Sequence, residues 1–172
     1  MPNIIFYGTK RGSIYCYDFA AKSIKGRWDV PRTERLNPES AQIKAVVHNP
    51  GENVFLALKK DNGTFYLYNT GENLHKMEFE GPPGGAHKLC WIDSVSGDFL
   101  VCSKKAGVLR VYNAAIPTCK EIIKVSRYGI YDIKRVSDEV FLLRLQNGQV
   151  TLFNIKMKKS LYTTEVGHTH QI

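Results

Sequence analysis

Four stretches of this sequence decide its fold, because they match one another position by position when each is aligned on its leading glycine. They read GSIYCYD at 12–18, GTFYLYN at 63–69, GVLRVYN at 107–113 and GQVTLFN at 148–154. The leading glycines are Gly12, Gly63, Gly107 and Gly148, so successive repeats begin 51, 44 and 41 residues apart. A period of this size indicates a repeated unit of several strands.

Each stretch carries the alternation of a β-strand. The second and fourth residues after the glycine are apolar, the fifth is Tyr or Phe, and the sixth is Asp or Asn. This period of two predicts a strand with one buried face. These positions are filled by Ile14, Cys16, Tyr17 and Asp18, by Phe65, Leu67, Tyr68 and Asn69, by Leu109, Val111, Tyr112 and Asn113, and by Val150, Leu152, Phe153 and Asn154.

Further apolar segments flank each stretch and complete a four-stranded unit. A hairpin partner precedes each glycine, at 4–7, 54–58, 99–102 and 140–143. An earlier strand is predicted at 43–48, 88–92 and 130–134, and a later one at 76–80, 121–125 and 160–165. Four antiparallel strands per repeat are typical of a β-propeller blade.

The repeats resemble the WD-repeat family. Tyr17-Asp18 and Tyr112-Asn113 are similar to its Trp-Asp dipeptide, and Gly167-His168 is similar to its Gly-His. The resemblance covers nearly the whole chain and implies an all-β fold, a β-propeller of WD-repeat type with about four four-stranded blades in an incomplete ring. The family's polar tetrad is not reproduced, because no Trp ends a third strand and the position of its Asp holds Arg11, Asn62, Ala106 and Asn147.

The repeat period predicts the order of domains along the chain. We expect a partial first blade at 1–28, an exposed loop at 29–41, a second blade at 42–81, a third at 82–125, a fourth at 126–166 and the start of a further blade at 167–172. This arrangement suggests a segment of a larger propeller, whose remainder would be a partner of this chain. The alternative is a four-bladed ring that residues 168–172 close.

Composition sets outer limits on the function. The chain has 172 residues, a formal net charge of +8 and a pI near 9.3, which favours acidic partners without defining a site. No apolar run reaches the length of a membrane span. The cysteines form no Cys-x-x-Cys pair, which fits a reducing compartment. We therefore expect a cytoplasmic protein without a membrane partner, in an assembly such as cytoskeletal or ciliary machinery.

Three of the four turns before an aligned glycine carry adjacent basic residues, Lys10-Arg11, Lys59-Lys60 and Lys104-Lys105. In a propeller these turns share one face, which the resemblance implies is commonly used to bind peptides. The sharper hypothesis is a basic rim that binds an acidic peptide, a glutamate-rich tail, a phosphopeptide or RNA. The alternative is that Lys and Arg are simply well solvated at exposed turns.

Motifs for chemistry are absent from the sequence. It contains no Gly-x-Ser-x-Gly, no phosphate-binding loop and no His-Glu-x-x-His, so we expect no enzyme and no cofactor. His168 and His170 lack further ligands nearby and predict no metal site. Asp132 and Asp138 near Tyr131 are the closest approach to an acid pair, and the basic run 156–159 is expected to be a solvated turn.

These observations together predict a non-catalytic protein-interaction scaffold. A basic RNA-associated propeller module is the alternative, and a steep dependence of binding on salt would distinguish it.

Overall fold

The computed structural model describes residues 3–31, 41–49, 51, 53–59, 63–72 and 75–165. Over these ranges the chain forms β-strands and no α-helix, which confirms the predicted all-β class. The strands pair into four antiparallel sheets. Sheets of three and four strands with simple up-and-down order are consistent with a propeller-like arrangement.

The sheets follow one another along the chain. Sheet A contains β1 (Ile4–Gly8), β2 (Ser13–Asp18) and β3 (Ser23–Asp29). Sheet B contains β4 (Ile43–Asn49), β5 (Val54–Lys59), β6 (Phe65–Asn69) and β7 (His75–Phe79). Sheet C contains β8 (Lys88–Trp91), β9 (Asp98–Ser103), β10 (Ala106–Asn113) and β11 (Ile116–Lys124). Sheet D contains β12 (Ile130–Arg135), β13 (Val140–Leu145), β14 (Gln149–Asn154) and β15 (Lys159–Glu165).

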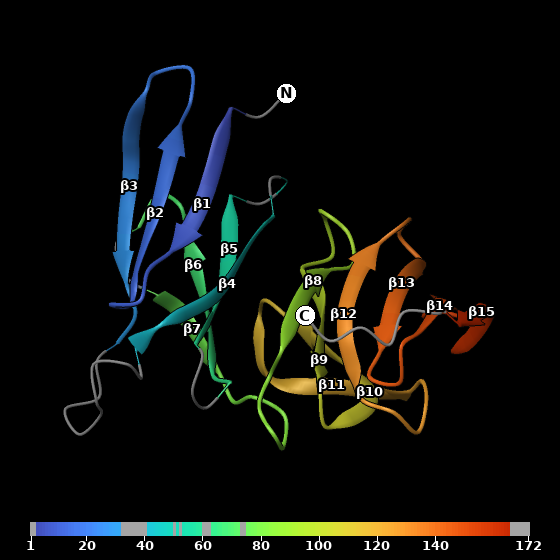
Figure 1. Ribbon diagram of the computed structural model, residues 1–172. Coiled ribbons are helices and arrows are strands. Elements are labelled where there is room, and N and C mark those ends of the chain that lie inside the picture. The colour runs from blue at the N-terminus through green and yellow to red at the C-terminus, as the bar shows by residue number, and fades with distance from the viewer. Residues whose placement is uncertain are drawn as a thin grey trace. The chain divides into compact units, whose positions relative to one another are not determined.

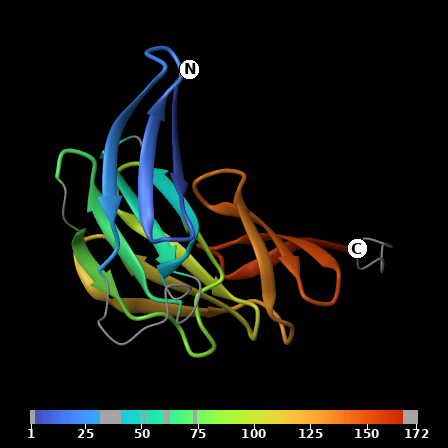
Figure 2. The same cartoon turned by 60° about the vertical axis from the view of Figure 1, so that its left-hand side comes forward.

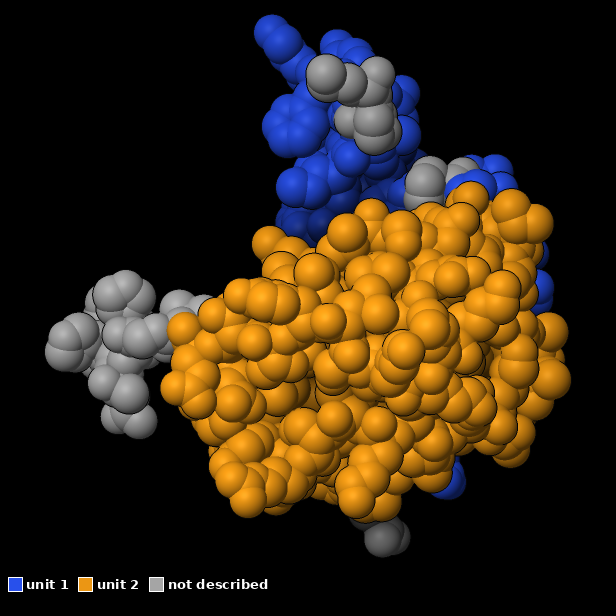
Figure 3. All heavy atoms as spheres, turned by 90° about the vertical axis from the view of Figure 1, so that its right-hand side faces the viewer, with its two compact units in different colours: residues 1–81 blue, residues 82–172 orange. Residues whose placement is uncertain are grey.

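The chain divides into two compact units, residues 1–81 with sheets A and B and residues 82–172 with sheets C and D (Figure 3). In both cartoon views the blue strands β1 to β3 lie side by side in sequence order (Figures 1 and 2). Most of the predicted loop 29–41 and all of the predicted blade start 167–172 lie outside the described residues.

The Asp or Asn that lies six residues after each leading glycine has the same structural role in all four sheets. The side-chain oxygen of Asp18 accepts a hydrogen bond from Ala20 N, and that of Asn69 accepts one from Gly71 N. Asn113 and Asn154 accept equivalent bonds from Ala115 N and Met157 N. Asp and Asn stabilise tight turns in this way, so this position holds the turn that joins the third and fourth strands.

A backbone irregularity also recurs at the repeat period. The pairing of the third with the fourth strand shifts register after Cys16 in sheet A and after Leu67, Val111 and Leu152 in sheets B, C and D. A β-bulge at one repeated position bends each sheet at the same place. The repeat found in the sequence is therefore a repeat of backbone geometry.

The leading glycines are required for two different reasons. Gly12, Gly63 and Gly148 have positive φ angles of 86°, 69° and 86°, which L side chains rarely adopt. Gly107 has no such angle, but a Cβ there would lie 2.2 Å from the carbonyl oxygen of Ser126. It is glycine because another backbone segment passes directly over it.

The core is more extensive than the sequence predicts. The prediction that the strand at 65–69 is buried on one face alone is wrong. Phe65 and Leu67 on one face and Tyr66 and Tyr68 on the other are all buried. Tyr66 and Tyr68 belong to the core shared with sheet A. A strand that is apolar on both faces is one that is covered on both faces, a possibility that a period of two does not reveal.

Strand β3 was not among the strands predicted from the sequence. Its sequence SIKGRWD has a glycine at its centre, and a Cβ on Gly26 would lie 2.3 Å from the Trp28 ring. Trp28 is buried, and its indole nitrogen donates to the carbonyl oxygen of Glu72 at 2.6 Å. The glycine makes room for Trp28, the largest side chain in the strand. A central glycine usually argues against a strand, but here packing requires it.

In the second unit, one face of sheet C packs against one face of sheet D. Buried apolar side chains of both sheets form a single cluster made of Leu100, Cys102, Leu109, Val111, Ile123, Ile130, Ile133, Phe141, Leu143, Leu145 and Phe153. Each fully buried Leu or Phe contributes about 1.5–3 kcal/mol. This interface fixes the side chains at the two ends of the strands of sheets C and D. In the described part of the chain, no helix is long and apolar enough to cross a membrane.

Candidate partner-binding site

The predicted basic turns do not all present their charge. Lys10 and Arg11 are exposed in the turn between β1 and β2. Lys59 is only 3% exposed, because it continues β5 and its amide donates to the carbonyl oxygen of Thr64. Lys60 lies outside the described residues. Lys59 is therefore not the exposed turn residue that the sequence predicted.

Lys104 and Lys105 do form a basic turn, between β9 and β10, and Lys104 lies beside an exposed aromatic ring. The ring belongs to Tyr131 on β12, which is 39% exposed. The Lys104 Nζ lies 4.2 Å from the ring centroid, and the Arg144 Cζ lies 4.3 Å from it. Edge-on packing by His87 completes the group, with ring centroids 5.3 Å apart. We call these four residues the Tyr131 cluster.

Cation–π contacts hold this cluster together. Each is worth about 0.5–1 kcal/mol at an exposed site, which offsets part of the roughly 2 kcal/mol of rotamer entropy that an ordered Lys or Arg side chain loses. The two cations come from β13 and from the β9–β10 turn, and the ring comes from β12. Tertiary structure thus concentrates two positive charges on one exposed ring.

A close backbone approach positions the cluster. A Cβ on Gly129 would lie 1.6 Å from the carbonyl oxygen of Lys104, so the segment before β12 lies directly against the β9–β10 turn. The amide of Gln146 also donates to the carbonyl oxygen of Gly129 at 2.8 Å. Gly129 therefore ties together the turn with Lys104, the strand with Tyr131 and the end of the strand with Arg144.

The strand register places the carboxylate of Asp132 opposite Arg144, a member of the Tyr131 cluster. Asp132 on β12 forms an ion pair with Lys88 on β8, with a nitrogen–oxygen distance of 3.8 Å. Asp138, the other member of the candidate acid pair, lies beyond the opposite end of β12 and pairs with Arg135. The two carboxylates thus belong to separate ion pairs, and the structure does not assemble them into an acid–base site.

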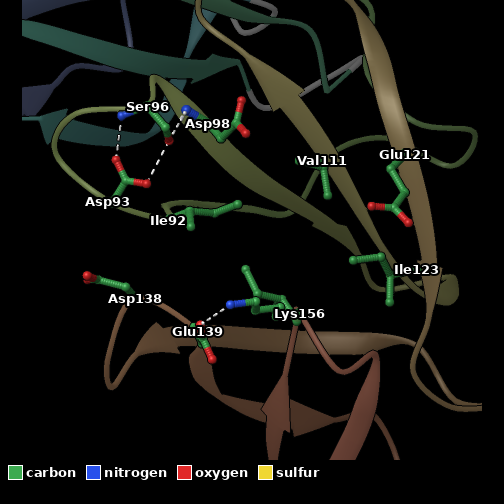
Figure 4. A pocket seen from close by; sticks show the side chains of 11 residues that line it. Ile92, Asp93, Ser96, Asp98, Val111, Glu121, Ile123, Asp138, Glu139 and Lys156 are labelled. Carbon is green, nitrogen blue, oxygen red and sulfur yellow. Dashed lines mark hydrogen bonds and ion pairs between the residues drawn. The ribbon is translucent and has the colours of Figure 1, made fainter.

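A cleft of about 300 Å³ lies between sheets C and D at the opposite end of their strands from Lys104 (Figure 4). Apolar walls and a carboxylate rim line it, and each carboxylate already has a partner in the unit. Asp98 is bound by Lys120 at 2.8 Å, Glu139 by Lys156 at 3.2 Å, Glu121 by Lys158, Asp138 by Arg135, and Asp93 by Ser96.

These contacts give the cleft a structural role. The Glu121–Lys158 pair joins β11 of sheet C to the β14–β15 turn of sheet D. Desolvation opposes ionisation of Asp93, but hydrogen bonds from Ser96 and Val95 outweigh it and lower the pKa of this carboxyl. The described residues contain no group of three His, Cys, Asp or Glu side chains that could hold a metal ion. Among these ion pairs, Glu121–Lys158 alone links sheet C to sheet D, whereas Asp98–Lys120 lies within sheet C and Glu139–Lys156 and Arg135–Asp138 lie within sheet D and its turns.

The second unit also contains the basic run 156–159 and the thiol of Cys90. Lys156 and Lys158, in the basic run 156–159, each form an ion pair with a glutamate, and their side chains remain 76% and 57% exposed. Burial raises the pKa of the Cys90 thiol, which keeps it protonated and a poor nucleophile at neutral pH. His168 and His170 lie outside the described residues.

No feature of the sequence pattern marked the Tyr131 cluster as a unit. Lys104 was singled out, but His87, Tyr131 and Arg144 were not linked to it, since they lie 17, 27 and 40 residues from Lys104 along the chain. Comparison of the chain with protein-family models and with curated proteins finds no match to either.

Proposed function

We propose that this protein is a non-catalytic interaction scaffold of the WD-repeat type that binds an acidic segment of a partner protein at the Tyr131 cluster. One observation carries the proposal: Lys104 in the β9–β10 turn and Arg144 on β13 bring two positive charges to one exposed ring. Carboxylates or phosphates would bind these charges, and the ring would contact the aliphatic part of the bound side chain.

The repeat supports the WD-repeat assignment within this proposal. Its period, the Asp or Asn after the aromatic residue and the strand order are those that the resemblance implies.

Direct binding of a labelled peptide tests the proposal. The probes are a fluorescent peptide of alternating Glu and Gly and its Gln counterpart, and the readout is fluorescence anisotropy. Wild-type protein should bind the acidic probe and not the neutral one. Replacing both cations (K104E/R144E) should weaken binding by about 100-fold, because a hydrogen bond to a charged group contributes about 1.5–3 kcal/mol.

A matched control separates the site from net charge. Exposed Lys25 on β3 and Lys76 on β7 lie outside the cluster, and K25E/K76E changes the formal charge by the same amount. This variant should bind as wild type does, apart from a small electrostatic effect that 150 mM salt suppresses. Equal losses in both double variants, or no binding of the acidic probe to wild type, would overturn the proposal.

RNA is the second candidate, because an exposed ring flanked by Arg and Lys could also stack a base. A single-stranded oligonucleotide should then compete with the acidic peptide. The logarithm of its association constant should fall linearly with the logarithm of the salt concentration, with a slope of about −0.7 for each phosphate contacted. Tyr131→Leu distinguishes the two, because it would abolish stacking of a base while leaving both positive charges for a peptide.

A further inference from the structure

The outer face of sheet D, turned away from sheet C, carries an exposed apolar row. Strand register places Lys134, Leu142, Leu152 and Tyr162 side by side across all four strands. Leu142 is 37% exposed and Tyr162 is 61% exposed. The opposite face of the same strands carries Phe141, Leu143 and Phe153, which are buried against sheet C.

The repeat shows that this position is normally covered. Leu142 follows the residue that pairs with the repeat aromatic, as Leu100 does in sheet C and Leu56 in sheet B. Both Leu100 and Leu56 are 0% exposed. Leu100 is covered by the face of sheet D that carries Phe141.

The same pairing of faces occurs between sheets A and B. Phe6 and Cys16 of sheet A, on the face that corresponds to Leu100, pack against Phe55 and Tyr68 of sheet B. Phe6 lies 5.0 Å from Phe55, centroid to centroid. Within each unit, therefore, the second sheet covers the first by placing its aromatic face on the face of the first sheet that corresponds to Leu100.

Sheet A exposes the other half of such an interface. Ile5 and Tyr7 occupy the positions of Phe141 and Leu143, and they are 46% and 41% exposed. Tyr7 stacks on Tyr15 with centroids 5.4 Å apart, and Tyr17 pairs with Ile5 across the strands. This surface is an aromatic face of the type that covers a neighbouring sheet in both units.

We infer that the outer face of sheet D binds the outer face of sheet A of a second copy of this chain. The two faces differ, so the contact is head to tail. Each copy carries one sheet A face and one sheet D face. Apolar rows drive the contact, because charges of both signs accompany them: Asp132 lies opposite Arg144 on the sheet D face, and Arg27 pairs with Asp29 on the sheet A face. Association driven by apolar surface should strengthen with salt, whereas binding of an acidic peptide at the Tyr131 cluster should weaken.

Complementation between variants tests this contact. Leu142→Glu disables the sheet D face and Ile5→Glu disables the sheet A face. Sedimentation velocity at about 50 μM should show wild type as dimers or larger and each variant alone as a monomer. An equal mixture of the two variants should form a one-to-one dimer, because one supplies an intact sheet A face and the other an intact sheet D face.

Controls keep the result interpretable. Val95→Glu adds the same charge at an exposed turn residue outside both faces and should associate as wild type does. Should either Glu variant lose its far-UV circular dichroism spectrum, Tyr162→Lys and Tyr7→Lys replace them at exposed positions of the same faces. A wild-type chain that stays monomeric at 50 μM in 0.5 M salt, or variants that associate as wild type does, would overturn the inference. Either result would leave the peptide-binding proposal intact.

Discussion

Replacing Gly129 by Ala should destabilise the second unit, because the new Cβ would meet backbone that cannot easily move. The carbonyl oxygen of Lys104 would have to retreat from 1.6 Å to at least 3.0 Å, the closest approach that Cβ atoms normally make. That shift would also strain the hydrogen bond from Gln146 N to Gly129 O. Overpacking of this kind costs about 1–3 kcal/mol, and the lower entropy of the unfolded Ala chain offsets about 0.4–1 kcal/mol of it.

The net loss of about 1–2 kcal/mol can be measured by urea unfolding. The midpoint should fall by about 0.5–1 M, given a urea dependence of about 2 kcal/mol per M. Gly71→Ala is the matched control, because its Cβ would have ordinary contact with Asn69 Oδ1 at 3.6 Å and its φ is not positive. Equal midpoints for the two variants would refute the argument that the backbone approach at Gly129 is rigid.

Three further predictions follow from burial. Partial burial lowers the pKa of His48, so the unfolded chain binds a proton at a higher pH than the folded chain does. The free energy of unfolding should therefore be highest above about pH 6.5 and should fall as the pH drops below it. The fall should be smaller in His48→Gln. Urea midpoints at pH 7.5 and 5.5 check this, and an equal fall in both proteins would contradict it. Leu143→Ala should lower the free energy of unfolding by about 2–5 kcal/mol in the same assay, and Leu142→Ala, at an exposed position, by much less. Equal losses would contradict the burial of Leu143 in the core. Iodoacetamide at pH 8 should modify partly exposed Cys119 in the native protein and buried Cys102 only after unfolding, as peptide mass spectrometry would show.

Most strands could be predicted because their signal is local. Alternation over five or six residues, glycine at a turn and Asp or Asn after an aromatic residue are read within one repeat. The structure explains the last of these as a turn cap, as at Asn69 and Asn113. The strand that contains Gly26 and Trp28 was not predicted, because its glycine is required for the packing of Trp28 within the strand. The alternation of apolar and polar residues carries no information about such packing.

Burial could not be predicted from the same pattern. Leu56 and Leu142 occupy the same position of the repeat, yet Leu56 is buried and Leu142 is exposed. What covers a sheet face is decided by another sheet, whose strands lie tens of residues away. The exposed faces of sheets A and D became apparent only from the positions that are buried in their neighbours.

The sequence by itself determined the repeat, the all-β class and the turns, since each depends on side chains a few residues apart. Tertiary structure decided which basic residues are available. It buried Lys59 within a strand and brought Lys104 and Arg144 to one ring on β12. The physical reason is that charge and alternation are properties of a segment, whereas exposure and the meeting of side chains arise only when separate strands pack together.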